Sequence, residues 1–147
     1  MPRSAIAKKP RPITASREKS GRAEELTREF THEKIEKGIA ASIVGKIVDA
    51  DILSRSEIER LVPARTLARR ISGRERLKSQ EADAIGRLLR LAAYGELMLG
   101  DKAFVHKWLR LSNPALKGRI PIELARTEAG AREVEAILTR IAYGDYS

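Results

Sequence analysis

The stretch of sequence that decides the fold is DKAFVHKWLRLSNPALKGRIPIELARTEAGAREVEAILTRIAYGDY, residues 101–146. It contains the only tryptophan of the chain, and its proline and glycine residues separate short helical runs. Asp101 is a predicted cap for a helix that carries Phe104 and Trp108 four residues apart. These two aromatic residues and Leu111 are predicted to pack in a small helical core. A contact with a partner stays open as the alternative for Trp108.

The second half of this stretch predicts further helix starts and one long closing helix. Asn113-Pro114 and Pro121 place proline where a first helical turn accepts it. Thr127 is the predicted cap of the last helix, and Gly144 is its predicted end. The apolar face of that helix consists of Val134, Ile137, Leu138 and Ile141.

Helical periodicity continues upstream of this stretch. Isoleucines at 35, 39, 43 and 47 form one apolar stripe, which predicts a helix over residues 31–50. A helical turn or two is expected over residues 23–30, and a longer helix runs from Ser79 to about Leu99. Since no segment alternates polar and apolar residues with period two, the predicted fold class is all-α.

Composition narrows the class of protein. The chain has 147 residues, of which 42% are hydrophobic and only 4% aromatic. Such a core is built mainly from alanine, leucine, isoleucine and valine, which suits helices. Without cysteine and without a long apolar run, the chain is expected to act in the cytoplasm, with no membrane contact. The predicted domains are residues 1–22, 23–98 and 99–147.

Positive charge is concentrated in two blocks. Of the net charge of +9, residues 1–22 contribute +6 and residues 55–78 contribute +5, while the region between them is acidic. Clustered positive charge is typical of a surface that binds a polyanion. Residues 1–22 are predicted to be a flexible tail that either contacts phosphates or only solubilises the chain.

Residues 54–72 predict two short helices joined by a tight turn, which is the layout of a helix-turn-helix. Ser54 and Glu57 have the spacing of a capping box for the first helix. In a helix-turn-helix the second helix places its first residues in the major groove of DNA. Arg65 and Thr66 are the predicted base-reading residues, because arginine can bind guanine with two hydrogen bonds.

The remaining basic residues of this region are predicted to contact phosphates, which supply affinity without sequence information. They are Arg69, Arg70, Arg74, Arg76 and Lys78. The helix start at Lys78-Ser79 offers free backbone amides for a further phosphate. The alternative interpretation is a solvated basic surface on two packed helices.

The motifs of an enzyme are missing from the sequence. It has no glycine-rich phosphate loop and no cysteine nucleophile, and His32 and His106 lie far apart with no nearby metal-ligand pattern. We therefore expect no catalytic residue, no metal site and no cofactor.

Four motifs in the last third resemble one family in order and spacing. They are WL at 108–109, NPALKGRIPIEL at 113–124, TEAG at 127–130 and VEAILTRIAYG at 134–144. This pattern resembles the toxin-binding domain of antitoxins of the Xre/MbcA/ParS type. RTLARRISGRERL at 65–77 resembles their helix-turn-helix, although Pro63 stands where the family often has serine.

The resemblance implies a type II antitoxin with an Xre-like helix-turn-helix domain followed by a small helical toxin-binding domain. Its partners would be a RES-domain toxin that acts on NAD, operator DNA and a second copy of the chain. The C-terminal end would lie at the toxin's active site, with an inhibitory edge of Arg140, Tyr143, Gly144, Asp145, Tyr146 and Ser147. The alternatives are a toxin-neutralising protein without DNA binding and a plain transcriptional regulator.

Overall fold

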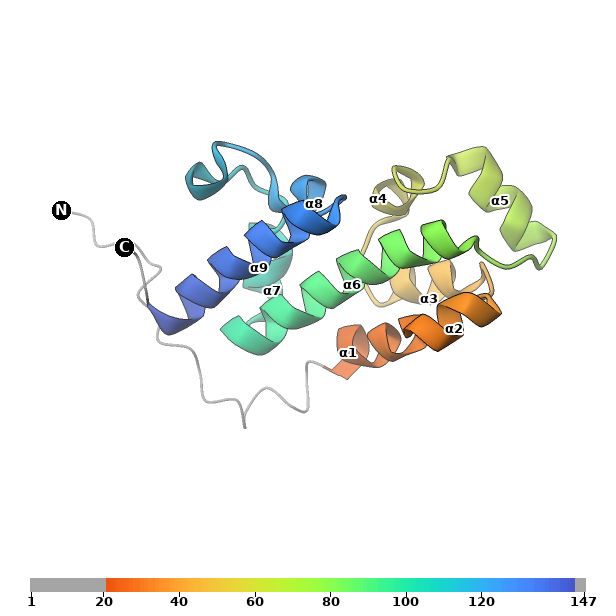
Figure 1. Cartoon of the computed structure of the whole chain (residues 1–147), viewed down its shortest axis with the longest axis horizontal. Helices are drawn as coiled ribbons and strands as arrows, with labels where there is room; N and C mark the ends of the chain where they lie inside the picture. Colours follow the sequence, from red (N-terminus) through yellow and green to blue (C-terminus); the bar gives the residue numbers. More distant parts are fainter. Residues whose placement is uncertain (1–20, 145–147) are drawn as a thin grey trace. The chain divides into compact units, whose positions relative to one another are not determined.

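The computed structural model describes residues 21–144, and these residues form an all-α fold, as predicted (Figure 1). Within this range the chain has no strand, and its only extended pairings are the isolated bridges Ala40–Arg76 and Asn113–Arg119. Packing separates a first unit, residues 22–90, from a second unit that begins at Leu91. The predicted domain boundaries stay predictions, and residues 1–20 of the predicted tail lie outside the described range.

The first unit is built from short helices and the first half of one long helix. They are α1 (Gly21–Thr27), η2 (Arg28–Phe30), α2 (His32–Lys37), α3 (Ile43–Asp49), α4 (Arg55–Glu59), α5 (Ala64–Ser72) and α6 (Ser79–Leu99). Their fully buried side chains are aliphatic, which agrees with the low aromatic content of the chain. They include Ile47, Leu53, Ile58, Val62, Leu67 and Ile85.

The predicted single helix over residues 31–50 is wrong, because the chain breaks between α2 and α3. Gly38 ends α2 with a positive φ of 93°, and residues 39 and 40 lie outside any helix. Two backbone hydrogen bonds hold the break, from Leu77 N to Ile39 O (2.8 Å) and from Ala41 N to Glu75 O (3.0 Å). All four isoleucines of the predicted stripe are nevertheless buried. The apolar periodicity therefore identified the core residues but not the interruption.

The second unit continues from the last turns of α6 into a small group of helices. They are α7 (Lys102–Trp108), η3 (Pro114–Leu116), α8 (Pro121–Leu124) and α9 (Glu128–Tyr143). Val105 of α7 and Leu138 of α9 both lie beside Gly95 of α6, since a Cβ built on that glycine would be 2.7 Å and 3.5 Å from their side chains. These three helices therefore meet in one small core.

Local capping residues begin and end these helices where the sequence predicted. The side chain of Asp101 accepts a hydrogen bond from Phe104 N, and that of Thr127 accepts one from Gly130 N. Gly144 ends α9 in the left-handed conformation, with φ 69°.

Gly130 is required where α8 meets α9. A Cβ at this position would lie 1.8 Å from the carbonyl oxygen of Leu124, far inside van der Waals contact. The start of α9 therefore approaches the end of α8 more closely than any other residue type would allow.

The predicted core role of Phe104, Trp108 and Leu111 is wrong for the two outer residues. Phe104 is 40% exposed and Leu111 is 53% exposed, while Trp108 is half-buried. The buried side of α7 is instead formed by Val105 and Leu109. The reason is the close approach of α7 to Gly95, which admits the branched Val105 and turns the larger side chains outward.

Across residues 21–144, none of the helices is both long enough and apolar enough to span a membrane.

Candidate functional site

Helices α4 and α5 form a helix-turn-helix within the first unit (Figure 1). Ser54 and Glu57 make the predicted capping box, with Ser54 N donating to Glu57 Oε2 at 2.9 Å. In the turn, Val62 N donates to the carbonyl oxygen of Ile58 at 2.9 Å. One buried side chain from each part, Ile58, Val62 and Leu67, anchors the motif in the core. The outward side of α5 is thereby fixed in place.

The predicted base-reading residues lie on that outward side. Arg65 is exposed, Thr66 is partly exposed, and Arg69 is exposed one turn further along α5. Arg65 and Arg69 stand four residues apart on a helix and therefore share one face. The structure brings Arg65 and Thr66 together at the N-terminal half of the second helix, where major-groove contacts are made in this motif.

Arg70 is not on the exposed face, contrary to the prediction. It is only 8% exposed, and its guanidinium lies 3.1 Å from Glu81 Oε1 and 3.6 Å from Glu75 Oε2. Its Nε is buried and makes no hydrogen bond among the described residues. Burial of a charged arginine is costly unless the side chain is paired. The ion pair of Arg70 with Glu81 offsets this cost and connects α5 to α6.

Arg76 also serves the fold. Its guanidinium donates hydrogen bonds to the carbonyl oxygens of Lys37 and Gly38, at the end of α2. Arg74 and Lys78 are both exposed, and Arg74 adopts a positive φ of 52°. Of the seven predicted DNA-contacting residues, Arg70 and Arg76 therefore make contacts inside the first unit, and the exposed Arg69 also lies 3.6 Å from Glu75 Oε1.

The acidic partners of the basic residues in this region were not predicted from the sequence. Glu81 accepts from Lys78 N at 2.8 Å through Oε2, while its other oxygen binds Arg70. The backbone amide of Lys78 at the start of α6 is thus already occupied. The spacing of Lys78 and Glu81, three residues apart at a helix start, is the signal that identifies this contact.

The predicted inhibitory edge lies at the end of α9. Arg140 is exposed, and Tyr143 is 77% exposed, the highest value among the large exposed hydrophobic residues of the described chain. Gly144 N donates to the carbonyl oxygen of Ile141, which closes the helix. Asp145, Tyr146 and Ser147 lie outside the described residues. The described part of the edge is therefore an exposed aromatic at a helix terminus.

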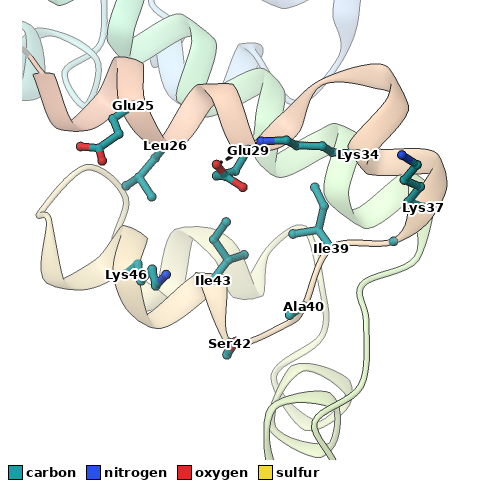
Figure 2. Close-up of a pocket in the computed structure, with 11 residues that line it drawn as sticks. Glu25, Leu26, Glu29, Lys34, Lys37, Ile39, Ala40, Ser42, Ile43 and Lys46 are labelled. Atoms are coloured by element: carbon teal, nitrogen blue, oxygen red, sulfur yellow. Dashed lines mark hydrogen bonds and ion pairs between the residues drawn. The ribbon is translucent and has the colours of Figure 1, made fainter.

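A cavity of about 570 Å³ lies between α1–α2 and α3 in the first unit (Figure 2). Its lining combines apolar side chains, such as Leu26 and Ile43, with both signs of charge. The charged members are Glu25, Glu29, Lys34, Lys37 and Lys46. Glu29 and Lys34 pair with each other at 3.1 Å, so the lining does not present a single sign of charge to a ligand.

One buried carboxyl group lies in the second unit. Burial raises the pKa of Glu96, and the nearby Lys102 ammonium partly offsets that rise. No cluster of His, Cys, Asp or Glu suited to a metal occurs among residues 21–144. A single buried carboxyl does not make an acid–base pair, because that chemistry needs a second positioned group.

The fold and the two exposed surfaces define a helical binding protein with a helix-turn-helix and a second helical unit. A family model described as the antitoxin Xre/MbcA/ParS C-terminal toxin-binding domain matches residues 95–144. The chain is also similar to three proteins named antitoxin Xre. That of Pseudomonas putida is 30% identical over 121 residues, which cover 82% of this chain and 76% of the relative.

The other two relatives are from Yersinia enterocolitica and Photorhabdus laumondii. They are 30% identical over 118 residues (78% of this chain and 80% of the relative) and 27% identical over 113 residues (75% and 76%). The chain belongs to the family of Xre antitoxins. It is therefore an antitoxin and not an enzyme, and its toxin-binding domain implies a toxin as partner.

Proposed function

We propose that this protein is the antitoxin of a type II system that neutralises a RES-domain, NAD-consuming toxin and represses its own operon. It would act as a homodimer, in the cytoplasm where operator DNA lies. The observation that carries the proposal is the combination, in one chain, of a helix-turn-helix with a domain that matches the toxin-binding family model. Each half supplies a surface for one of the two partners.

Inhibition is assigned to the edge Arg140–Ser147. Tyr143 is largely exposed at the last turn of α9, although aromatic side chains are normally buried in a folded domain. An aromatic group held at a rigid helix end can fill a pocket at small entropic cost. The proposed mechanism is steric, because this edge would occupy the toxin's active site and exclude its substrate.

DNA binding is assigned to the exposed face of α5. Arg65 and Thr66 would read bases, while Arg69, Arg74 and Lys78 would contact phosphates. Two copies of the helix in a homodimer would enter neighbouring half-sites of an operator. Arg70 is not part of this surface, because its buried side chain pairs with Glu81 of α6.

A second candidate is a toxin-neutralising antitoxin that does not bind DNA. The internal contacts of Arg70 and Arg76 favour it, because two of the seven predicted DNA-contacting residues serve the fold. A plain helix-turn-helix regulator is the third candidate. It does not account for the match of residues 95–144 to a toxin-binding domain.

The proposal is tested by co-expressing the chain with the product of the adjacent open reading frame, which we expect to be a RES-domain protein. We expect the two proteins to co-purify and NAD consumption by the toxin to be suppressed. In a gel-shift experiment, we expect the antitoxin to retard a DNA fragment from upstream of the operon. If the pair co-purifies but no upstream fragment is bound, the second candidate holds. If the neighbouring protein neither binds nor is inhibited, the RES assignment is wrong.

A further inference from the structure

We propose that the surface formed by Phe104 and Trp108 of α7 and by Leu111, which follows the end of this helix, anchors the toxin; it is called here the α7 face. This inference rests on the proposed function and adds to it, because it separates anchoring from inhibition. The inhibitory edge at the end of α9 would block the active site. The α7 face would supply the main binding energy at a different place in the same domain.

Phe104 and Trp108 stand four residues apart on α7 and therefore share one face of the helix. Leu111 follows three residues after the helix ends at Trp108 and is also exposed. Val105 and Leu109 occupy the other side and are fully buried. Because Val105 is wedged beside Gly95, the helix cannot rotate to bury Phe104 without pulling Val105 out of this packing.

The exposure of this face is unusual for side chains of this size. Aromatic side chains bury roughly 150–250 Å² each when they are fully packed, so the exposed parts of Phe104 and Trp108 represent an unused driving force for association. The exposed side of α9 near its start is charged and not apolar, because Arg132 pairs there with Glu128 at 3.9 Å. Tryptophan is also among the residue types most enriched at the energetic centres of protein interfaces.

The occupant is a toxin and not another partner, for two reasons. The α7 face lies wholly inside residues 95–144, the part that matches the toxin-binding domain of the family. The segment that carries this face, residues 101–119, is also basic, with five lysine or arginine side chains and one acidic side chain. The matching toxin surface would therefore be an apolar patch with an acidic border, because complementary charge favours the correct partner.

The test measures binding of the purified antitoxin to a catalytically inactive form of the RES-domain toxin that the proposed function expects the adjacent open reading frame to encode. The variants are Phe104→Ser/Leu111→Ser, which replaces the two most exposed members, and Trp108→Ala. The matched control is Leu97→Ser, because Leu97 is 51% exposed and belongs to α6. Circular dichroism melting of each variant, and light scattering of the antitoxin alone, accompany the binding titrations.

We expect each α7 variant to weaken the Kd by about tenfold or more, and Leu97→Ser to change it by less than about twofold. Melting temperatures and the mass of the free antitoxin should stay as in the wild type for the double variant. An unchanged Kd in the double variant would overturn the proposal, as would an equal loss in the Leu97 control. A changed mass of the free antitoxin would show that a second copy covers the face, which also overturns it. If the wild type does not bind the toxin at all, the RES-toxin proposal itself fails.

Discussion

Arg70 of α5 donates a hydrogen bond to Glu81 of α6, with Nη2 and Oε1 3.1 Å apart, and both side chains are largely buried. The pair joins the second helix of the helix-turn-helix to the long helix that follows it. An arginine that the sequence places among DNA-contacting residues thus has a structural role.

Replacing Arg70 by alanine should destabilise the fold more than replacing its neighbour. Arg70→Ala removes the cationic partner of the largely buried Glu81, which keeps only the hydrogen bond from Lys78 N, and we expect a loss of about 3 kcal/mol in the free energy of unfolding. Arg69→Ala removes an exposed side chain and should change stability by less than about 0.5 kcal/mol. Urea unfolding of both variants measures the difference. Equal stability of the two would show that the buried pair contributes nothing.

The exposed arginines of α5 should be needed for DNA and not for toxin. In the double variant Arg65→Ala/Arg69→Ala, we expect operator binding to weaken. The loss of the base-reading Arg65 alone should cost about 1–3 kcal/mol of binding free energy. The dependence of affinity on salt concentration should also become shallower, because the variant neutralises fewer phosphates and releases fewer counterions. Toxin neutralisation should be unaffected. Gel-shift titrations at two salt concentrations measure both effects.

The matched control for this experiment is Arg28→Ala/Arg132→Ala, which removes the same charge from exposed positions outside α5. It should bind operator DNA nearly as well as the wild type. If both double variants bind equally weakly, net charge and not the α5 face is responsible.

Removing residues 144–147 should separate binding from inhibition. The truncated chain keeps the α7 face, so we expect it to remain bound to the toxin, while NAD consumption by the complex returns. Arg132→Ala, on an exposed part of the same helix α9, serves as the control and should leave inhibition intact. Full inhibition by the truncated chain would rule out residues 144–147 as the inhibitory part of the edge and would leave Arg140 and Tyr143.

Gly130→Ala should destabilise the chain, because the added Cβ would lie 1.8 Å from Leu124 O and would force α8 and α9 apart. We expect a loss of about 3 kcal/mol, the upper end for overpacking. Gly45→Ala is the control and should change the free energy of unfolding in the opposite direction, because no atom lies within 4 Å of a Cβ built on this helical glycine. It should stabilise α3 by about 0.5–1 kcal/mol. Thermal or urea unfolding that ranks the two in the reverse order contradicts this packing.

Glu96 should make stability depend on pH. Because burial raises its pKa in the folded state, the folded chain retains the proton over a pH range in which the unfolded chain has released it. Stability should therefore fall as the pH rises from the ordinary value of 4.5 through the raised pKa. Glu96→Gln has no such proton to release, so its stability relative to the wild type should increase with pH over the same window. A difference that is constant with pH would contradict the raised pKa.

Much of the helical pattern was predictable because it depends on neighbours in the sequence. Ser54, Asp101 and Thr127 each accept a hydrogen bond from a backbone amide three residues later, so these helix starts depend on local chemistry. The end of α9 at Gly144 is equally local, since glycine adopts a positive φ without a Cβ clash. The apolar stripe through Ile35 and Ile47 also identified core residues correctly.

The sequence by itself determined the all-α class, the helix caps and the basic outward side of α5. Only the tertiary structure decided the break at Gly38, the burial of Arg70 and the direction that α7 presents to solvent. Each of these depends on a residue distant in sequence: Arg76 beside Gly38, Glu81 beside Arg70, and Gly95 beside Val105. Periodicity and charge describe one segment at a time. Whether a side chain is buried or exposed depends on which residues of other segments pack against it.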